Sequence, residues 1–114
     1  MKTEHQEQVQ LVRWFRASHP SVLIFAIPNG GYRSRVTASR LKAEGVVRGI
    51  PDLYIPAWSL WIEMKRSQGG SLSPDQKAML EYLQSYCKHT VMVARGADDA
   101  IDQIASFVER LEKW

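Results

Sequence analysis

The stretch from Gly49 to Lys65, GIPDLYIPAWSLWIEMK, contains two short apolar runs separated by a turn. The runs are Asp52 to Pro56 and Leu60 to Lys65, and only residues 57–59 lie between them. Two apolar runs with so short a connection predict an antiparallel β-hairpin. The hairpin therefore determines which polar side chains of this stretch meet.

The second predicted strand has charged residues in an otherwise apolar sequence. Glu63 and Lys65 are two residues apart and share one face, whereas Ile62 and Met64 point the other way, into the core. The short turn brings Asp52, at the start of the first strand, opposite them. Two carboxylates and an ammonium group are thus predicted to converge in one small space.

Paired carboxylates satisfy the preference of Mg²⁺ for oxygen ligands, together with waters and substrate oxygens. Such an ion activates a water, polarises a scissile phosphate and stabilises the charge on the leaving oxygen. Lys65 beside it would orient the water or neutralise the transition state. The alternative for Glu63 and Lys65 is an exposed salt bridge, which is common at this spacing on strands.

The residues on either side of the hairpin alternate between helical and strand patterns. Leu11, Val12 and Phe15 predict a helix from about residue 3 to 17, and Val22 to Ile27 predicts a strand. Residues 34 to 44 favour a partly exposed helix that ends at Gly45.

The C-terminal part of the chain continues the alternation. Ser73 as N-cap and Pro74 predict a helix to about Tyr86, with an apolar face of Met79, Leu80, Leu83 and Tyr86. A strand at Thr90 to Ala94 and a helix from Ala97 to Leu111 follow, and the helix is expected to bury Ile101, Ile104, Ala105, Val108 and Leu111. The predicted class is α/β, with a central mixed sheet flanked by helices.

Length and composition indicate one globular domain over residues 1–114, which are 45% hydrophobic. No apolar run reaches the roughly 20 residues of a membrane span, and the N-terminus lacks a signal-peptide core, so we expect a cytoplasmic protein. The single cysteine, Cys87, is expected to be a reduced core residue. Neither Cys87 nor the three histidines form a zinc-ligand spacing, and no serine-triad pattern is present.

The net charge of +3 is modest but unevenly distributed. Residues 30 to 48 carry Arg33, Arg35, Arg40, Lys42 and Arg48 against the single acid Glu44. This basic segment is a candidate for phosphate contacts. An ordinary solvated loop and helix face remains the alternative, because charge alone does not separate the two.

The pattern Pro51-Asp52 followed by Glu63-x-Lys65 resembles the PD-(D/E)xK nuclease signature. Four longer blocks, at residues 26–33, 41–46, 49–53 and 72–76, closely resemble the virus-type replication-repair nuclease domain, VRR-NUC. The blocks occur in the same order and span nearly the whole chain. The resemblance implies a restriction-endonuclease-like core.

The resemblance also implies roles for individual residues. Asp52 and Glu63 correspond to the metal ligands, with the Met64 carbonyl completing the shell, and Lys65 corresponds to the catalytic lysine. The implied cofactor is Mg²⁺, with Mn²⁺ able to substitute. Gln76 corresponds to a glutamine near the active site, although Leu80 stands where a tyrosine is often found.

Members of the family also have an acidic residue in the first helix, and Glu4 and Glu7 both fit. Periodicity places Glu4 and Gln8 on the stripe of Leu11 and Phe15, and Glu7 towards its flank, which favours Glu4 with Gln8. The alternative for either acid is a first-turn residue that stabilises the helix dipole.

A DNA-facing surface is predicted from the turn after the first strand and from the basic residues that follow. Its members are Asn29, Gly30, Gly31, Tyr32, Arg33, Arg35, Arg40, Arg48 and Arg66. A plain strand-to-helix turn is the alternative, more so for Asn29 than for Arg33.

The aromatic residues are mostly expected in the core: Trp14, Phe15, Phe25, Trp61 and Phe107. Trp58 at the hairpin tip and Trp114 at the C-terminus are candidates for exposed subunit contacts.

These observations predict a metal-dependent DNA endonuclease, and the resemblance hints at phage or mobile-element DNA processing. A catalytically silent nucleic-acid-binding module is the alternative, disfavoured because Asp52, Glu63 and Lys65 are all present. A domain this small reaches one scissile bond, so a homodimer is expected where both strands are cut.

Overall fold

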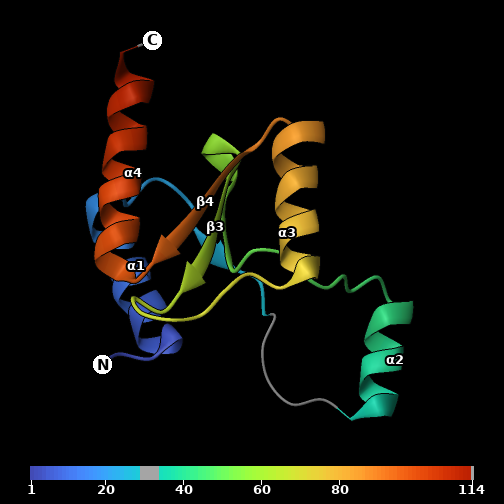
Figure 1. The fold of residues 1–114 in the computed structure, drawn as a ribbon. Coiled ribbons are helices and arrows are strands. Elements are labelled where there is room, and N and C mark those ends of the chain that lie inside the picture. The colour runs from blue at the N-terminus through green and yellow to red at the C-terminus, as the bar shows by residue number, and fades with distance from the viewer. Residues whose placement is uncertain (29–33, 114) are drawn as a thin grey trace.

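The computed structural model describes residues 1–28 and 34–113. In chain order the helices and strands are α1 (Glu4–Ser18), β1 (Phe25–Ala26), α2 (Arg35–Ala43), β2 (Leu53–Ile55), β3 (Leu60–Lys65), α3 (Pro74–Glu81), β4 (Thr90–Arg95) and α4 (Ala97–Glu112) (Figure 1). A 3₁₀ turn, Pro56–Trp58, joins β2 to β3, and a π-helical turn, Tyr82–Tyr86, follows α3. Over the described ranges, no helix is long and apolar enough to cross a membrane.

The four strands form one mixed sheet in the order β1-β2-β3-β4. β1, β2 and β3 are antiparallel neighbours, and β4 joins β3 in parallel through the crossover that contains α3. The predicted hairpin is confirmed, with Leu53 opposite Ile62 and Ile55 opposite Leu60. The predicted α/β class with a central mixed sheet is confirmed as well.

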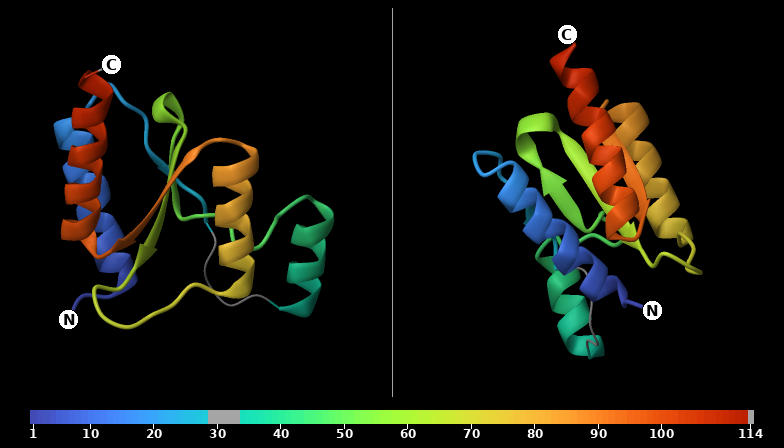
Figure 2. Two further views of the ribbon diagram at one scale, coloured as in Figure 1. Left: turned by 45° about the horizontal axis from the view of Figure 1, so that its top comes forward. Right: turned by 90° about the vertical axis from the view of Figure 1, so that its left-hand side faces the viewer.

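The helices cover the two faces of the sheet unequally. α1 and α4 pack side by side on one face, and α3 with its π turn lies over β4 on the other (Figures 1 and 2). The first face carries the core, whose buried members include Leu11, Phe15, Leu53, Ile55, Leu60, Ile62, Met64, Met92, Ala94, Ala100 and Ile104. α2 stands apart from the sheet and buries none of its residues, consistent with its few apolar positions (Figure 2).

Element boundaries differ from expectation at β1 and α3. The strand predicted over Val22 to Ile27 is regular only at Phe25–Ala26, where Phe25 lies opposite Tyr54 and Ala26 opposite Leu53. Just beyond it, the Ile27 amide donates a hydrogen bond to the Asp52 carbonyl oxygen at 2.8 Å. The helix predicted to run to Tyr86 is α-helical to Glu81 and then widens into the π turn. That turn shifts Tyr86 off the apolar stripe, and its expected burial is wrong.

Three further burial predictions are wrong for geometric reasons. In α4 the buried stripe is Ala97, Ala100, Ile104 and Phe107, which leaves Ala105 and Leu111 exposed. Phe25 is 38% exposed, with one side of its ring edge-on to Tyr54 at a centroid distance of 5.9 Å. Cys87 is partly exposed instead of being a core residue.

Trp58 is partly buried and packs against the core, so the prediction that it is exposed at the hairpin tip is wrong. Its ring packs edge-on against Phe15, with ring centroids 5.6 Å apart, and lies 5.7 Å from that of Phe107. The 3₁₀ turn folds the hairpin tip back over the core, whereas the sequence predicted a tip that extends into solvent. Trp114 lies outside the described residues.

Gly49 brings the segment before β2 into contact with the start of α3. Its φ is +85°, and a Cβ atom there would lie 2.6 Å from the Asp75 carbonyl oxygen. Only glycine permits both this conformation and this approach. The contact places Asp52 close to the N-terminus of α3.

We expect Gly49→Ala to destabilise the domain more than Gly45→Ala. Both glycines have positive φ, so either alanine costs about 1–3 kcal/mol of backbone strain. At Gly45 nothing lies within 4 Å of the added atom, whereas at Gly49 the Asp75 backbone must move, which adds about 1–3 kcal/mol. Urea denaturation measures the difference, and equal losses in the two variants would contradict it.

Candidate active site

Asp52 is held against β3 by a backbone hydrogen bond. Continuing the antiparallel register by one residue past Leu53 and Ile62 brings Asp52 opposite Glu63. The Met64 amide donates to Asp52 Oδ2 over 2.7 Å. The predicted meeting of the two carboxylates at one end of the hairpin is therefore present in the structure.

Glu63 is a buried acid, with only 2% of its surface exposed. Its Oε2 atom accepts a hydrogen bond from Gln76 Nε2 at 3.2 Å and lies 3.6 Å from Lys65 Nζ. Among the side chains of residues 1–28 and 34–113, its Oε1 is the one buried polar atom that has no hydrogen-bond partner. An unpaired buried carboxylate oxygen is costly, so this atom marks a place for a ligand.

Gln76 is positioned by the N-terminal cap of α3. The Ser73 backbone amide donates to Gln76 Oε1 at 2.9 Å, and the Gln76 backbone amide donates to Ser73 Oγ at 3.1 Å. The two bonds form a reciprocal capping box. Gln76 Oε1 also accepts a hydrogen bond from Lys65 Nζ at 3.1 Å. The side chain thus links the helix start to both charged residues of β3.

Burial raises the pKa of Glu63 from 4.5 to about 8, and the negative charge of the nearby Asp52 acts in the same direction. The negative charge of Glu4 acts in the same direction, and the ammonium of Lys65 opposes it. A second nearby positive charge would allow both carboxylates to ionise together. The electrostatics thus favour a cation beside Glu63.

The donor set fits a hard divalent cation. Within the described part of the chain, no group of three or more His, Cys, Asp or Glu side chains is arranged around one point. Mg²⁺ does not require such a cage, since it binds through one or two carboxylates and retains several waters. Asp52 and the open Oε1 of Glu63 supply that minimum.

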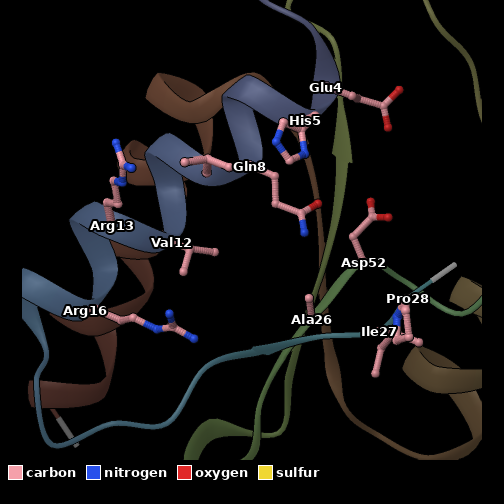
Figure 3. A pocket seen from close by; sticks show the side chains of 11 residues that line it. Glu4, His5, Gln8, Val12, Arg13, Arg16, Ala26, Ile27, Pro28 and Asp52 are labelled. Carbon is pink, nitrogen blue, oxygen red and sulfur yellow. The ribbon is translucent and has the colours of Figure 1, made fainter. Parts of the chain in front are cut away.

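The acid of the first helix that faces the site is Glu4. Glu4 and Gln8 line the same hollow as Asp52 (Figure 3), and only Glu4 of the two helix acids acts on the Glu63 charge. A role for Glu4 in metal binding stays a prediction.

Glu7 lies on the buried face of α1 with Leu11 and Phe15, and not on the flank of that face as periodicity suggested. It is buried, and its Oε1 accepts a hydrogen bond from the Ala97 amide at 3.1 Å. It therefore caps α4, whose N-cap residue Gly96 has no side chain to do so. The spacing of Glu7, Leu11 and Phe15, four residues each, was the signal for this burial.

The predicted DNA-facing residues divide into several groups. Arg48 lines a hollow that also contains Asp52 and Gln76, and Arg66 is exposed directly after β3. Arg35 and Arg40 lie on α2, away from the sheet. The loop of Asn29, Gly30, Gly31, Tyr32 and Arg33 lies outside the described residues.

Arg95 supports the site in a way that the sequence did not indicate. Its Nη1 donates to the carbonyl oxygens of Gly69 and Gly70, at 3.0 and 3.1 Å. These glycines belong to the connection between Lys65 and Gln76. The two glycines predict a turn, but the arginine that holds them is 26 residues from Gly69 and 25 from Gly70 and carries no local signal.

Comparison with solved structures identifies the domain. No family model matches the chain, and no curated protein matches it. One solved structure, described as a "VRR_NUC domain protein", superposes with a TM-score of 0.76 and 25% sequence identity, over 96% of this chain and 90% of that one. The resemblance to the VRR-NUC domain that the sequence indicated is thereby confirmed.

The restriction-endonuclease-like fold expected for a VRR-NUC domain is thereby confirmed. The neighbour's description indicates a nuclease-type domain, and nucleases of this fold generally use divalent metal. The buried Glu63, with its open Oε1 atom, and the partly exposed Asp52 lie at the hairpin end where the VRR-NUC resemblance implies the metal ligands.

In metal-free buffer, we expect the protein to lose stability as the pH rises from about 4.5 to about 8. Over this range the unfolded chain releases the Glu63 proton while the folded protein retains it, so proton release favours unfolding. Above about pH 8 both states are ionised, and this contribution becomes constant.

Thermal melting in EDTA at several pH values checks the effect. Glu63→Gln should remove this part of the decline, whereas Glu109→Gln, at a side chain that is 69% exposed, should retain it. An unchanged decline in Glu63→Gln would show that another group is responsible.

Proposed function

We propose that this VRR-NUC domain is a metal-dependent endonuclease that hydrolyses phosphodiester bonds in DNA. The observation that carries the proposal is the unpartnered, buried Oε1 of Glu63 beside a second carboxylate, Asp52, at the end of the hairpin. Retention of such an atom costs stability unless a ligand satisfies it. A cation that binds a substrate phosphate is the ligand that fits both the charge and the nuclease-type fold.

The proposed ligands are Asp52, Glu63 and the Met64 carbonyl, with Glu4 contributing from α1. Mg²⁺ is the proposed ion, and Mn²⁺ is expected to substitute for it. When bound, the ion supplies a water of lowered pKa and positive charge on the scissile phosphate. Asp52 has one oxygen committed to the Met64 amide, which orients its other oxygen for a ligand.

Lys65 is the proposed electrostatic catalyst. Its side chain is buried apart from 10% of its surface and lies 3.6 Å from Glu63 Oε2. A fixed ammonium in a water-poor site stabilises the negative charge that develops on a phosphate in the transition state. Its hydrogen bond to Gln76 restricts it to one orientation before the substrate arrives.

Gln76 is proposed to position Glu63 and Lys65 relative to each other. One amide group bonds to both, through Nε2 to Glu63 and through Oε1 to Lys65. Because the amide itself is neutral, it fixes this geometry without changing the net charge of the site. The same group is close enough to the acids to hold a phosphate oxygen or a water.

For the substrate, we propose that the predicted DNA-facing residues contact the backbone on the α2 side of the site. Arg48 is nearest, in the hollow it shares with Asp52, and the arginines of α2 extend the basic surface outward. Phage or mobile-element DNA processing is the proposed setting, and it rests on the family resemblance.

The direct test is nicking of supercoiled plasmid with Mg²⁺ or Mn²⁺. We expect metal-dependent nicking that EDTA abolishes. Lys65→Met should lower the rate about 10²–10³-fold, the usual effect of losing one fixed electrostatic group. Lys113→Met is the matched control, since that side chain is 71% exposed and far along α4, and it should cut at the wild-type rate.

Metal binding provides a readout separate from hydrolysis. Mg²⁺ should raise the melting temperature of the wild type, since it binds only the folded protein, and Asp52→Asn should lose most of that rise. Undiminished nicking in EDTA or in Asp52→Asn would contradict the proposed mechanism. Metal binding without nicking would instead support the silent-module alternative.

We also propose that the domain acts as a homodimer, because one copy presents a single acid pair and duplex cleavage needs two. Light scattering at the concentrations used for the nicking assay should give twice the mass of the 13.0 kDa chain. A monomer mass under those conditions would contradict the dimer and leave single-strand nicking unaffected.

A further inference from the structure

A hollow extends from Asp52 along α1, on the side of the site opposite α2. It has a volume of about 550 Å³ and lies between the helix and β1 (Figure 3). Its lining residues are Glu4, His5, Gln8, Val9, Val12, Arg13, Arg16, Ala26, Ile27, Pro28 and Asp52. We refer to it as the α1 groove.

Charge is separated along the α1 groove. Glu4 and Asp52, both proposed metal ligands, form its acidic end, and Arg13 and Arg16 lie about two and a half and three helical turns further along α1. Both arginines are exposed, and neither forms an ion pair with any acid among the described residues. Two uncompensated cations at one end of a groove are suited to an anion.

The floor between these ends offers no competing charge. Val12, Ala26 and Ile27 provide apolar surface, and Gln8 projects an amide toward the Asp52 side (Figure 3). A sugar–phosphate backbone presents apolar sugar faces between charged phosphates. Along the α1 groove, acids are followed by an amide, an apolar floor and arginines. This order fits a DNA strand that runs from the scissile phosphate at Asp52 toward Arg16.

Asp52 also borders a second hollow of about 440 Å³, on the opposite side, which contains Arg48. Asp52 therefore borders two hollows, each with arginine on its wall. A strand that places its phosphate at Asp52 can extend into both. The α2 side alone would hold only one of the two flanks of the scissile bond.

The helix sets the reach of this contact. Glu4 and Arg16 are separated by twelve residues of α1, which span about 18 Å at 1.5 Å per residue. At about 3.4 Å of duplex axis per nucleotide, this corresponds to roughly five nucleotides. Arg13 and Arg16 therefore reach phosphates well outside the reacting bond.

We propose that the α1 groove binds the backbone of the cleaved strand, with Arg16 and Arg13 contacting phosphates up to about five nucleotides from the scissile bond. The inference rests on the proposed nuclease function and adds a second backbone-binding surface to it. Arg16 is the principal contact, because its side chain extends along the groove, whereas Arg13 lies at the far edge of the helix (Figure 3).

The alternative is that Arg16 has only a structural role, and the test must distinguish this role from phosphate binding. It lies in the last turn of α1, where a cation also stabilises the helix dipole. Arg110 occupies the same kind of position, exposed in the last turn of α4, and does not line the α1 groove. Arg110→Gln is therefore a matched control for Arg16→Gln.

The test measures binding to a fluorescein-labelled 30-base-pair duplex in EDTA, so that hydrolysis is absent. Fluorescence anisotropy between 50 and 200 mM NaCl gives the slope of log K against log [NaCl], which changes by about 0.9 for each phosphate contact. Arg16→Gln should reduce the slope by about 0.9, and Arg13→Gln with Arg16→Gln by up to twice that. Arg16→Lys, which keeps the charge, should restore it.

The outcomes separate the two proposals. A wild-type slope in the double variant, or an equal reduction in Arg110→Gln, would overturn the α1 groove as a backbone site. A reduced slope only in the groove variants, with unchanged melting temperatures, would support it. Because binding is measured without metal, this result stands or falls independently of whether plasmid is nicked.

Discussion

Repulsion between two carboxylates at the end of one hairpin is the constraint around which the site is arranged. Asp52 and Glu63 face each other across β2 and β3, and Glu63 is buried. The Met64 amide, the Gln76 amide and Lys65 each offset part of the cost. None of them satisfies Glu63 Oε1, so the protein alone leaves the arrangement incomplete. A bound cation would complete it, which links the stability of the domain to its chemistry.

The geometry of this site depends on segments that are distant from one another in the chain. Gly49 allows the segment before β2 to lie against the start of α3, and the capping box of Ser73 and Gln76 turns the Gln76 side-chain amide toward β3. Arg95, at the end of β4, donates a hydrogen bond to the Gly69 carbonyl oxygen and so holds the connection between β3 and α3. The acids are therefore held by backbone contacts of the sheet and helix start more than by flexible surface side chains. Such rigidity is what preorganised electrostatic catalysis requires.

The sequence predicted those features that depend on local periodicity and capping. Alternation in β3 separated Glu63 and Lys65 from Ile62, and Ser73 with Pro74 indicated the start of α3. Packing between distant segments was not predictable in this way. The burial of Glu7 against Ala97 and the packing of Trp58 on Phe15 depend on how α1, α4 and the hairpin tip meet. The α1 groove likewise exists only because β1 lies beside α1.

The bond between Glu7 and the start of α4 also bears on how the chain acquires its fold during synthesis. Residue 7 leaves the ribosome about ninety residues before its partner, Ala97. Contacts of such long sequence separation form slowly and form together. Helix α1 packs more extensively against α4 than against β3, so it gains its full support only when α4 has been made. A nascent chain that lacks the last strand and helix therefore lacks the packing that holds Glu4 near Asp52.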